Sequence, residues 1–440
     1  MCPGAAPDSP PWAKALPVQL EDWAARLLAT EAASERVALH VNDTIAAFLT
    51  GSDTADAGAL CRCYANGSRT ERAAAAAAIA RLSECDDIHL ASCVTPGAAV
   101  VPVALALSGK SDAQTFHRAV TAGYAAGISL GKAIGGTKAL HNGVWPTLIA
   151  APLMAAVTTS CLSGHDAKVL AHAMALALSG TSGRIGRPAG APSGRWFVFA
   201  ESVLKGIRAA EAAGNGFRGD LDLISPAWLA AQAGHENVDA GVFESAPPAI
   251  AETGFKPFPI ARQGLNAVIA FQNLLAKGLD PQRIDSVQVF VPAINAALLS
   301  RPANDQDRLS RISNLGYQFA CAALAPDLLY DPERIPPAGV PLMEWARRVT
   351  LTQAQDLNKY LPDRWAASVV VNAGDKRAEE TLIQSPFDAD APDVKEALTK
   401  KWHKMAVKGS ENPLTGTEQH HGYAIIWEKL EARLSRVAKP

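Results

Sequence analysis

Residues 84–102 read ECDDIHLASCVTPGAAVVP, and the rest of the chain is organised around this stretch. Two adjacent carboxylates, Asp86 and Asp87, and the imidazole of His89 precede a turn of small residues, after which the chain becomes apolar. The apolar part predicts a buried helix. The stretch therefore brings polar side chains to the edge of a hydrophobic core, where binding and catalytic sites are usually built.

Length and charge predict a folded protein of two domains with no polyanionic partner. The chain has 440 residues, which exceeds what one hydrophobic core normally organises, and 48% of its residues are hydrophobic. Its formal net charge is -2, so no positive field would gather nucleic acid. We therefore expect no nucleic-acid partner.

Cysteine usage and hydropathy bear on the compartment. The seven cysteines are an odd number, and several lie in apolar or Ala-rich surroundings, as is typical of reduced thiols in the cytoplasm. The N-terminus lacks the basic and apolar segments of a signal peptide, and no window reaches the ~18–20 continuous apolar residues of a membrane span. We expect a cytoplasmic protein without a membrane partner.

Helical patterns fill the first half of the chain. A Pro-rich arm at 1–16, which we expect to be disordered, precedes predicted helices at 20–35, 44–49, 72–82, 98–107, 112–132, 147–162, 166–178 and 199–213. Asn42-Asp43 is interpreted as the N-cap of the second helix. Several of these helices are apolar nearly all round, which indicates burial on several sides.

Strand patterns occur only after residue 254. Residues 285–291 alternate and are rich in β-formers, and the runs 367–372 and 377–383 flank a Gly-Asp turn, as in a hairpin. Further helices are predicted at 263–277, 317–324, 342–349 and 423–434. We therefore predict a mostly α protein with an all-helical domain at 1–257, a smaller α+β domain at 258–395, and a return to the helical domain at 396–440.

Two sets of residues are candidates for proton transfer. Asp86-Asp87 with His89 could hold a general acid or base, because adjacent carboxylates or burial can move a pKa toward neutrality. As a bare pattern, the same residues are explained more simply as a solvated helix end. His141, in a Gly-flanked loop, is either an acid–base group or an ordinary loop histidine.

Arginines gather in a loop at 182–195 that is too rich in Gly and Pro for regular structure. Arg184, Arg187 and Arg195, together with Lys256, could clamp carboxylates, which guanidinium groups bind in a bidentate manner. Solvated surface charges are the alternative interpretation.

Motifs for metals, nucleotides and serine hydrolysis are missing. Cys61-x-Cys63 lacks a second Cys or His pair nearby, and His420-His421 are adjacent near the C-terminus, which is not the spacing of a zinc site. No Gly-x-Gly-x-x-Gly follows a strand, and neither a phosphate-binding loop nor Gly-x-Ser-x-Gly occurs. We expect no metal and no nucleotide cofactor.

A series of short motifs, none specific alone, resembles the MmgE/PrpD family over residues 20–435. In chain order they are Asp43–Ala47 with Gly51, Ala65–Gly67, Asp86–His89, Pro96-Gly97 with Pro102–Ala106, Gly123-Tyr124, Trp145–Thr147, Gly216–Gly219 and Lys256–Pro259.

The resemblance implies a fold and a chemistry. It implies a large helical domain, a smaller α+β lid domain, a cleft between them and a homodimer. The family includes 2-methylcitrate dehydratase, cis-aconitate decarboxylase and iminodisuccinate epimerase, which act on small polycarboxylates without a metal or organic cofactor. They do so by moving a proton next to a carboxylate, which requires a base and cations that stabilise the developing charge.

This chain departs from the family pattern at three titratable positions. Thr95 stands where the family has His before Pro, Trp145 stands where it has His in a His-Pro-Thr, and Arg195 stands where it has Lys. A hydroxyl, an indole and a guanidinium are not ready bases at neutral pH. Of the polar set, Asp86, Asp87 and Lys256 are kept, with Tyr317 at a cleft position.

Two hypotheses follow. In the first, the protein is a lyase or isomerase in which Lys256 or His141 is the base, Arg195 anchors a carboxylate, and Asp86 or Asp87 orients the cations. The substrate would then lie against a more apolar cleft, at Thr95, Trp145, Trp196 and Tyr317, with His89 as a neighbour. In the second, the chain is a non-catalytic relative that binds a small ligand or serves in assembly.

Overall fold

The computed structural model describes residues 17–64, 66–109, 111–184, 193–300, 302, 307–406 and 422–438. The predicted arm at 1–16, Arg187 and His420-His421 lie outside the described residues. In the described part α-helices dominate, and the named strands form one four-stranded sheet. The prediction of a mostly α fold with a smaller α+β part is confirmed.

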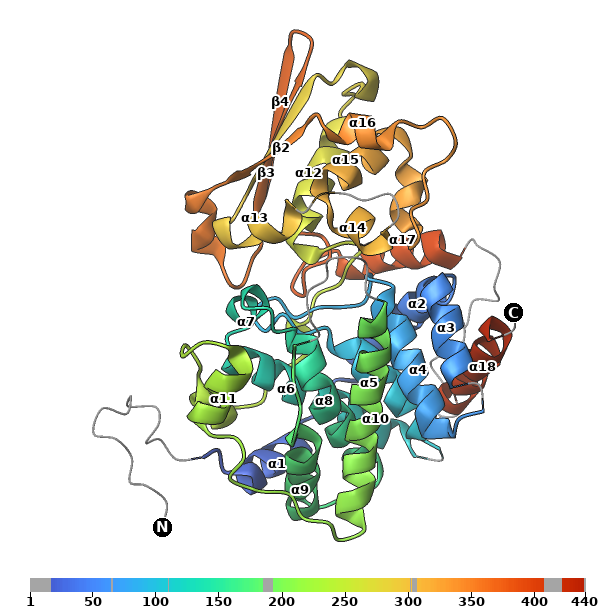
Figure 1. Cartoon of the computed structure of the whole chain (residues 1–440), viewed down its shortest axis with the longest axis vertical. Helices are drawn as coiled ribbons and strands as arrows, with labels where there is room; N and C mark the ends of the chain where they lie inside the picture. The colour runs from blue at the N-terminus through green and yellow to red at the C-terminus, as the bar shows by residue number, and fades with distance from the viewer. Residues whose placement is uncertain are drawn as a thin grey trace, which may run out of the picture.

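A large set of helices shares one hydrophobic core and forms a helical body, the lower part of Figure 1. Its core runs from Val18 to Ile250 and also takes in Leu430 and Leu434 near the C-terminus. The helices are α1 (Leu20–Leu28), α2 (Ser34–Gly51), α3 (Ala55–Cys63), α4 (Arg69–Leu82), α5 (Pro96–Leu107), α6 (Ala113–Ala133), α7 (Thr137–His141), α8 (Pro146–Leu162), α9 (Ala167–Leu178), α10 (Gly194–Gly214), α11 (Pro226–Ala233) and α18 (Gly422–Val437). Short 3-10 helices η2 (Ala240–Phe243) and η3 (Ile250–Glu252) follow α11.

A second core of buried side chains, from Phe258 to Ala373, forms an α+β body, the upper part of Figure 1. Its helices are η4 (Arg262–Gly264), α12 (Leu265–Ala276), η5 (Pro281–Arg283), α13 (Ala293–Leu299), α14 (Arg308–Ser313), α15 (Leu315–Leu324), η6 (Pro326–Tyr330), α16 (Leu342–Ala346) and η7 (Gln355–Tyr360). Helix α17 (Val394–Ala406) lies at the junction of the two bodies (Figure 1). The domain boundaries after 257 and 395 stay predictions.

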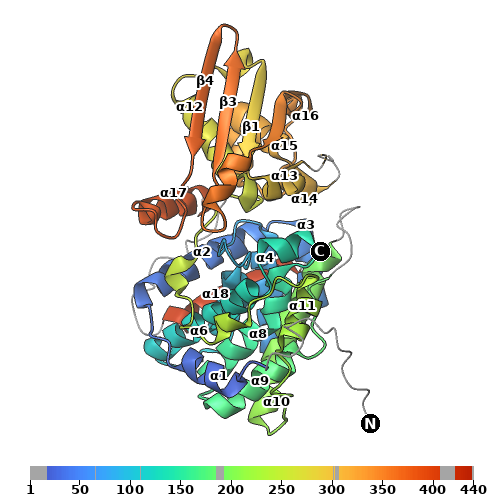
Figure 2. The same ribbon diagram turned by 90° about the vertical axis from the view of Figure 1, so that its left-hand side faces the viewer.

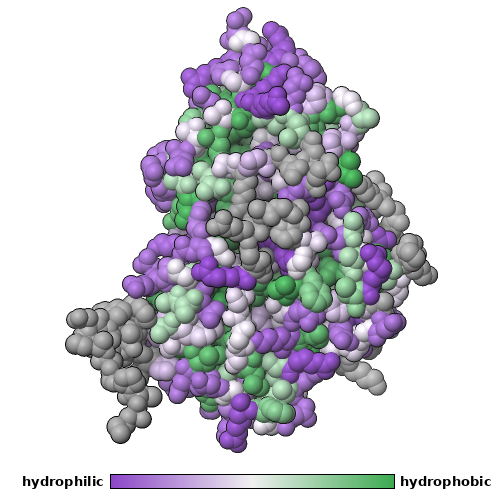
Figure 3. All heavy atoms as spheres, in the orientation of Figure 1, coloured by the Kyte–Doolittle hydropathy of each residue, from purple (hydrophilic) through white to green (hydrophobic). Residues whose placement is uncertain are grey.

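The sheet has the strand order β2-β1-β3-β4, with β1 (Ser286–Val291), β2 (Val349–Gln353), β3 (Ala367–Ala373) and β4 (Lys376–Leu382). β1 pairs in parallel with β2 and antiparallel with β3, and β3 and β4 form the predicted hairpin. Helix α12 packs against β3 and β4 (Figure 2). Strand β4 is an edge strand whose exposed positions include Lys376 and Arg377, and this end of the molecule is hydrophilic in Figure 3. Such charges prevent edge-to-edge pairing with other sheets.

Four predictions about the elements are wrong in detail. α2 is continuous through Asn42-Asp43, because Asp43 is buried and bonded inside the protein and does not cap a helix end. The first helix, which was predicted to span 20–35, ends at Leu28. The helix predicted at 342–349 ends at Ala346, and residues 349–353, where no strand was predicted, form β2 and pair with β1. Finally, Arg195 lies in the first turn of α10, whereas it was predicted to lie in a loop.

Helices α5 and α8 are almost wholly buried and apolar. Even so, among the described helices none combines the length and the hydropathy needed to cross a bilayer.

Two long helices of the helical body touch at a glycine. A Cβ at Gly206 of α10 would meet the carbonyl oxygen of Pro152 in α8 far inside van der Waals contact, and would lie 2.8 Å from the Cβ of Ala155. The crossing of α8 and α10 therefore requires glycine at this position.

We expect Gly206→Ala to lower the free energy of unfolding by about 2 kcal/mol, because overpacking forces the helices apart. Gly58→Ala is the matched control in a helix interior, where the added Cβ would meet the flexible end of Arg62 at 3.3 Å and the backbone oxygen of Val437 at 3.9 Å, an ordinary contact. It should leave stability unchanged or raise it by about 0.5–1 kcal/mol, since alanine is the better helix former. Urea unfolding measures both, and equal midpoints would contradict the close crossing.

Candidate functional site

The stretch that opens the sequence analysis becomes a tight loop between α4 and α5. Two of its residues that are not glycine, Glu84 (φ 58°) and Cys93 (φ 54°), have left-handed backbone conformations. The loop is held by isolated β-bridges, one between Ile88 and Gly254 and one between His89 and Val94. Strained residues persist only where the surroundings fix them, and they cluster at functional sites.

Asp87 points into the helical body and is fully engaged there. It accepts hydrogen bonds from His40 Nδ1 (2.8 Å), Tyr124 Oη (2.6 Å) and the backbone N–H of Gly97 (2.9 Å). All of these side chains are buried. A Cβ at position 97 would lie within 2.9 Å of Thr44, Tyr124 and Asp87, so only glycine can stand there. Asp87 therefore serves to hold the loop against the core.

Asp86 makes its contacts with a different set of residues. Its Oδ1 accepts from Arg81 Nη1 (3.2 Å) and from Lys256 Nζ (3.0 Å). Its Oδ2 is buried and has no hydrogen-bond partner among the described residues. Burial raises the pKa of Asp86, although the charges of Arg81 and Lys256 oppose the shift.

Lys256 reaches Asp86 because the chain that leaves the helical body is anchored on both sides of it. Gly254 bridges to Ile88, and Ile260 donates its N–H to the carbonyl of Glu84 (3.0 Å). Glu84 itself pairs with Arg81 (3.0 Å). Burial opposes ionisation of Glu84, but Arg81, Lys256 and Arg195 together lower its pKa.

Beside these charges lies a stack of guanidinium groups and indoles that we call the Arg–Trp cluster, formed by Arg81, Trp145, Arg195, Trp196 and Arg308. The Cζ of Arg195 lies 4.7 Å from the ring centre of Trp145 and 4.9 Å from that of Trp196. The Cζ of Arg81 lies 5.2 Å and 5.9 Å from the same rings. Each such contact stabilises by roughly 0.5–2 kcal/mol, and more when it is dry.

Arg81 thus lies between two groups of residues that were predicted from the sequence. Asp86 and Lys256 lie on one side of it, and Trp145, Arg195 and Trp196 lie on the other. Thr95 lies next to them, because its N–H and its hydroxyl both reach Thr147 Oγ1 (3.1 and 3.2 Å), two residues after Trp145.

Three predicted residues lie elsewhere. His141 is exposed at the end of α7. Tyr317 is buried in the α+β body, where its hydroxyl donates to the carbonyl of Arg334 (3.0 Å). His89 is buried, and its Nδ1 accepts from the N–H of Ser92 (3.2 Å), which leaves Nε2 facing Glu252 at 3.5 Å. Burial lowers the pKa of His89, and the hydrogen bond from His89 lowers the pKa of Glu252 to about 2.

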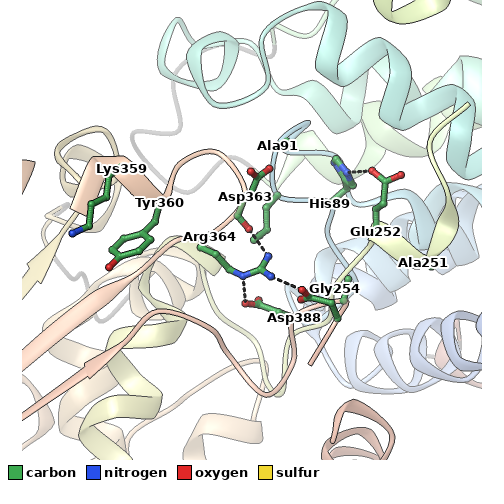
Figure 4. Close-up of a pocket in the computed structure, with 13 residues that line it drawn as sticks. His89, Ala91, Ala251, Glu252, Gly254, Lys359, Tyr360, Asp363, Arg364 and Asp388 are labelled. Atoms are coloured by element: carbon green, nitrogen blue, oxygen red, sulfur yellow. Dashed lines mark hydrogen bonds and ion pairs between the residues drawn. The ribbon is translucent and has the colours of Figure 1, made fainter. Parts of the chain in front are cut away.

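His89 lines an open pocket of about 660 Å³ between the two bodies, which Figure 4 shows. Its lining carries four carboxylates, from Glu252, Asp363, Asp388 and Asp390. The cations are two, Lys359 and Arg364, and Arg364 is paired with Asp390 (2.5 Å). A lining in which carboxylates outnumber cations does not suit an anionic substrate.

The sequence analysis did not single out Arg81, Glu84 or Arg308. Arg81 and Glu84 carried a weak signal, because a charged pair at i and i+3 follows a run of alanines. Arg308 carried none, since its position depends on how the two bodies meet. No group of three or more His, Cys, Asp and Glu side chains that could hold a metal ion occurs within the described part of the chain.

Asp87 generates a prediction about stability. Asp87→Asn replaces one acceptor oxygen by an NH₂ group, so at least one of the three buried donors around it loses its acceptor. We expect the free energy of unfolding to fall by about 2–4 kcal/mol. Asp363→Asn, at an exposed carboxylate of the pocket, is the control and should change it by less than about 0.5 kcal/mol. Chemical denaturation of both variants measures the difference, and a stable Asp87→Asn protein would refute this role.

Comparison with known proteins agrees with the motifs. The profile of the MmgE/PrpD N-terminal domain matches residues 18–239, about half of the chain, which includes the loop at 84–97 and the first turns of α8 and α10. No match was found among curated proteins. The family resemblance is thereby confirmed, and the chain belongs to the MmgE/PrpD family.

Proposed function

We propose that the protein is a cofactor-independent lyase or isomerase that acts on a small carboxylic acid by proton transfer next to a carboxylate. Membership of the family supports a dehydratase-like or lyase-like activity in broad terms. The site we propose consists of Asp86, Lys256 and the Arg–Trp cluster.

One observation carries this proposal: Asp86 is a buried carboxylate with one oxygen held by two cations and the other oxygen unoccupied. Oδ1 is fixed by Arg81 and Lys256, whereas Oδ2 has no partner among the described residues. A raised pKa brings the carboxyl closer to the range in which a general base works well. Asp86 is therefore a better candidate for the base than Lys256, whose ammonium donates to it, or the exposed His141.

The step we propose is the transfer of a proton from the substrate to Asp86 Oδ2. The proton on the carbon next to the substrate carboxylate moves to Asp86 Oδ2, and the C–H electron pair delocalises into the carboxylate as an enediolate. Lys256 and Arg81 are placed to stabilise this negative charge, which is the largest contribution in many such reactions. Protonation of the opposite face by water, while Asp86 keeps the abstracted proton, gives epimerisation, and departure of a β-hydroxyl that takes the proton from Asp86 and leaves as water gives dehydration. In decarboxylation, CO₂ leaves first and protonated Asp86 would supply the proton to the carbanion.

The Arg–Trp cluster supports a small acid with an apolar part. Its two indoles give apolar surface, while its arginines offer N–H groups in a fork that matches a carboxylate. Thr95, Trp145 and Arg195 are the positions at which the family pattern has titratable groups, so this chain would perform its proton transfer with fewer histidines.

The replacement of titratable groups at these three positions also supports the second candidate function, a non-catalytic relative that binds a small ligand or serves in assembly. In that case an acid would bind without being turned over.

Three further points belong to the proposal. From family membership we propose a homodimer that works without a metal or organic cofactor. From the free cysteines among the described residues, six in number, we propose a cytoplasmic location.

A screen and one matched pair of variants test the function. Small carboxylic acids that bind the native state raise its melting temperature by mass action, and NMR in D₂O then shows which of them exchange or lose the hydrogen next to the carboxylate. Asp86→Asn should lower turnover by about 10²–10⁴ and leave the thermal shift in place, as expected for loss of a general base. His141→Ala should leave turnover unchanged. If turnover is unchanged in Asp86→Asn, Asp86 is not the general base.

The pH dependence follows from the raised pKa of Asp86. A base acts only when ionised, so kcat/KM should rise with pH as Asp86 loses its proton, with a midpoint above 3.8, the ordinary value for the residue. The residual rate of Asp86→Asn should not show this rise with pH, because the titrating carboxyl is gone. A wild-type profile that is flat from pH 4 to 7 would contradict the role of Asp86, and a profile that falls as pH rises would contradict its role as a base and leave only its role as the proton donor in decarboxylation.

A further inference from the structure

Arg308 belongs to the α+β body but reaches into the helical body. It is the first residue of α14, and its Nη1 donates to the carbonyl of Leu82 (2.9 Å), the last residue of α4. The same nitrogen approaches the carbonyl of Pro332 in its own body (3.5 Å). Only 8% of the residue is exposed. Its guanidinium therefore lies between the two bodies, next to the loop that carries Asp86.

The other terminal nitrogen of Arg308 lacks a hydrogen-bond acceptor. Nη2 is buried, and no described residue accepts from it. Asp56 Oδ2 forms an ion pair with this nitrogen at 3.7 Å, which is too long for a hydrogen bond. A buried donor without an acceptor is unfavourable, and more so when it is charged, so this position favours a ligand that supplies an acceptor.

Trp196 presents a second unmatched donor in the same cluster. Its ring centre lies 5.9 Å from the Cζ of Arg308, and only 1% of the residue is exposed. Its Nε1 is buried and has no acceptor among the described residues. Arg308 and Trp196 come from different bodies, so the two donors are brought together only where these bodies meet.

We propose, on the basis of the function proposed above, that Arg308 Nη2 and Trp196 Nε1 form a carboxylate subsite that anchors the substrate and joins the two bodies. A carboxylate has two oxygens with about four acceptor positions, enough to satisfy both donors at once. The guanidinium of Arg308 supplies a positive charge that attracts the carboxylate. The indole N–H of Trp196 favours a ligand group that accepts a hydrogen bond over one that donates it.

The subsite has a defined place relative to the reacting end. Arg81 lies between the two, since its Nη1 contacts Asp86 and its Cζ lies 5.9 Å from the ring of Trp196. An acid bound through its carboxylate at Arg308 and Trp196 would extend past Arg81 toward Asp86 Oδ2. Arg308 would thus determine specificity without taking part in proton transfer, and binding would favour the docked arrangement of the bodies.

Titration calorimetry with propionate and succinate as probes, and with propionamide as the uncharged counterpart, tests the subsite. The wild-type protein should bind the carboxylates and not the amide. Arg308→Lys keeps the charge but loses the fork, and Trp196→Phe keeps a ring for the arginines but loses the N–H. Each should weaken carboxylate binding by about tenfold or more, the effect of one charge-assisted hydrogen bond.

Glu333→Ala is the matched control. Glu333 also joins the bodies, because its Oε1 accepts from the N–H of Ala55 (3.1 Å), but it offers no donor to the cluster. The Glu333→Ala protein should bind propionate and succinate with the affinity of the wild type. Both Arg308→Lys and Trp196→Phe retain most of the packing, and circular dichroism checks that each is folded.

The outcomes separate the two proposals. If the carboxylates bind all proteins equally, the subsite is wrong while the proposed function stands. If neither carboxylate binds even the wild type, both fail. If Glu333→Ala weakens binding as much as Arg308→Lys does, docking of the bodies explains the effect and the subsite is again wrong.

Discussion

The three hydrogen bonds to Asp87 are the constraint on which the rest of the site depends. His40, Tyr124 and the N–H of Gly97 hold this buried carboxylate inside the helical body. Because Asp86 precedes it directly in a strained loop, fixing Asp87 also fixes the direction in which Asp86 leaves the backbone. Two adjacent aspartates therefore have different roles: one holds the loop to the core, and the other faces the cations at the junction.

A second attachment comes from the C-terminal part of the chain. Lys401 of α17 is wholly buried and donates to Asp43 Oδ1 (2.5 Å) and to the carbonyl of Cys85 (2.8 Å). It thus binds the peptide immediately before Asp86. Burial raises the pKa of Asp43, while Lys401 opposes the shift. Removing either partner would leave the other charge buried alone, which is strongly unfavourable. The loop is therefore tied to α2, to α17 and to the segment that carries Lys256, so both bodies determine its geometry.

Charge is the reason for which we propose that an acid binds at the Arg–Trp cluster and not in the open pocket. At the pocket, carboxylates outnumber cations and Arg364 is already paired. At the cluster, Arg81 pairs with Glu84 and Asp86, and the guanidinium faces of Arg81 and Arg195 also lie over indoles. The aromatic rings therefore add cation–π contacts to the ion pairs that hold these buried cations.

The sequence by itself determined the family, the helical character of the first half and the β3–β4 hairpin, and it singled out Asp86, Asp87 and Lys256 as candidates. These features follow from local patterns: apolar periodicity, turn residues and motif order. Strand β2 and the mid-helix position of Asp43 were not predicted, because β2 is specified by its pairing with the distant strand β1 and Asp43 by its bond to Lys401. Only the tertiary structure gave Asp86 and Asp87 different partners, separated His141 and Tyr317 from the cluster, and brought in Arg81 and Arg308. The physical reason is that hydrogen bonds and ion pairs depend on distances between residues far apart in sequence, as between Arg308 and Leu82, and no local pattern records them.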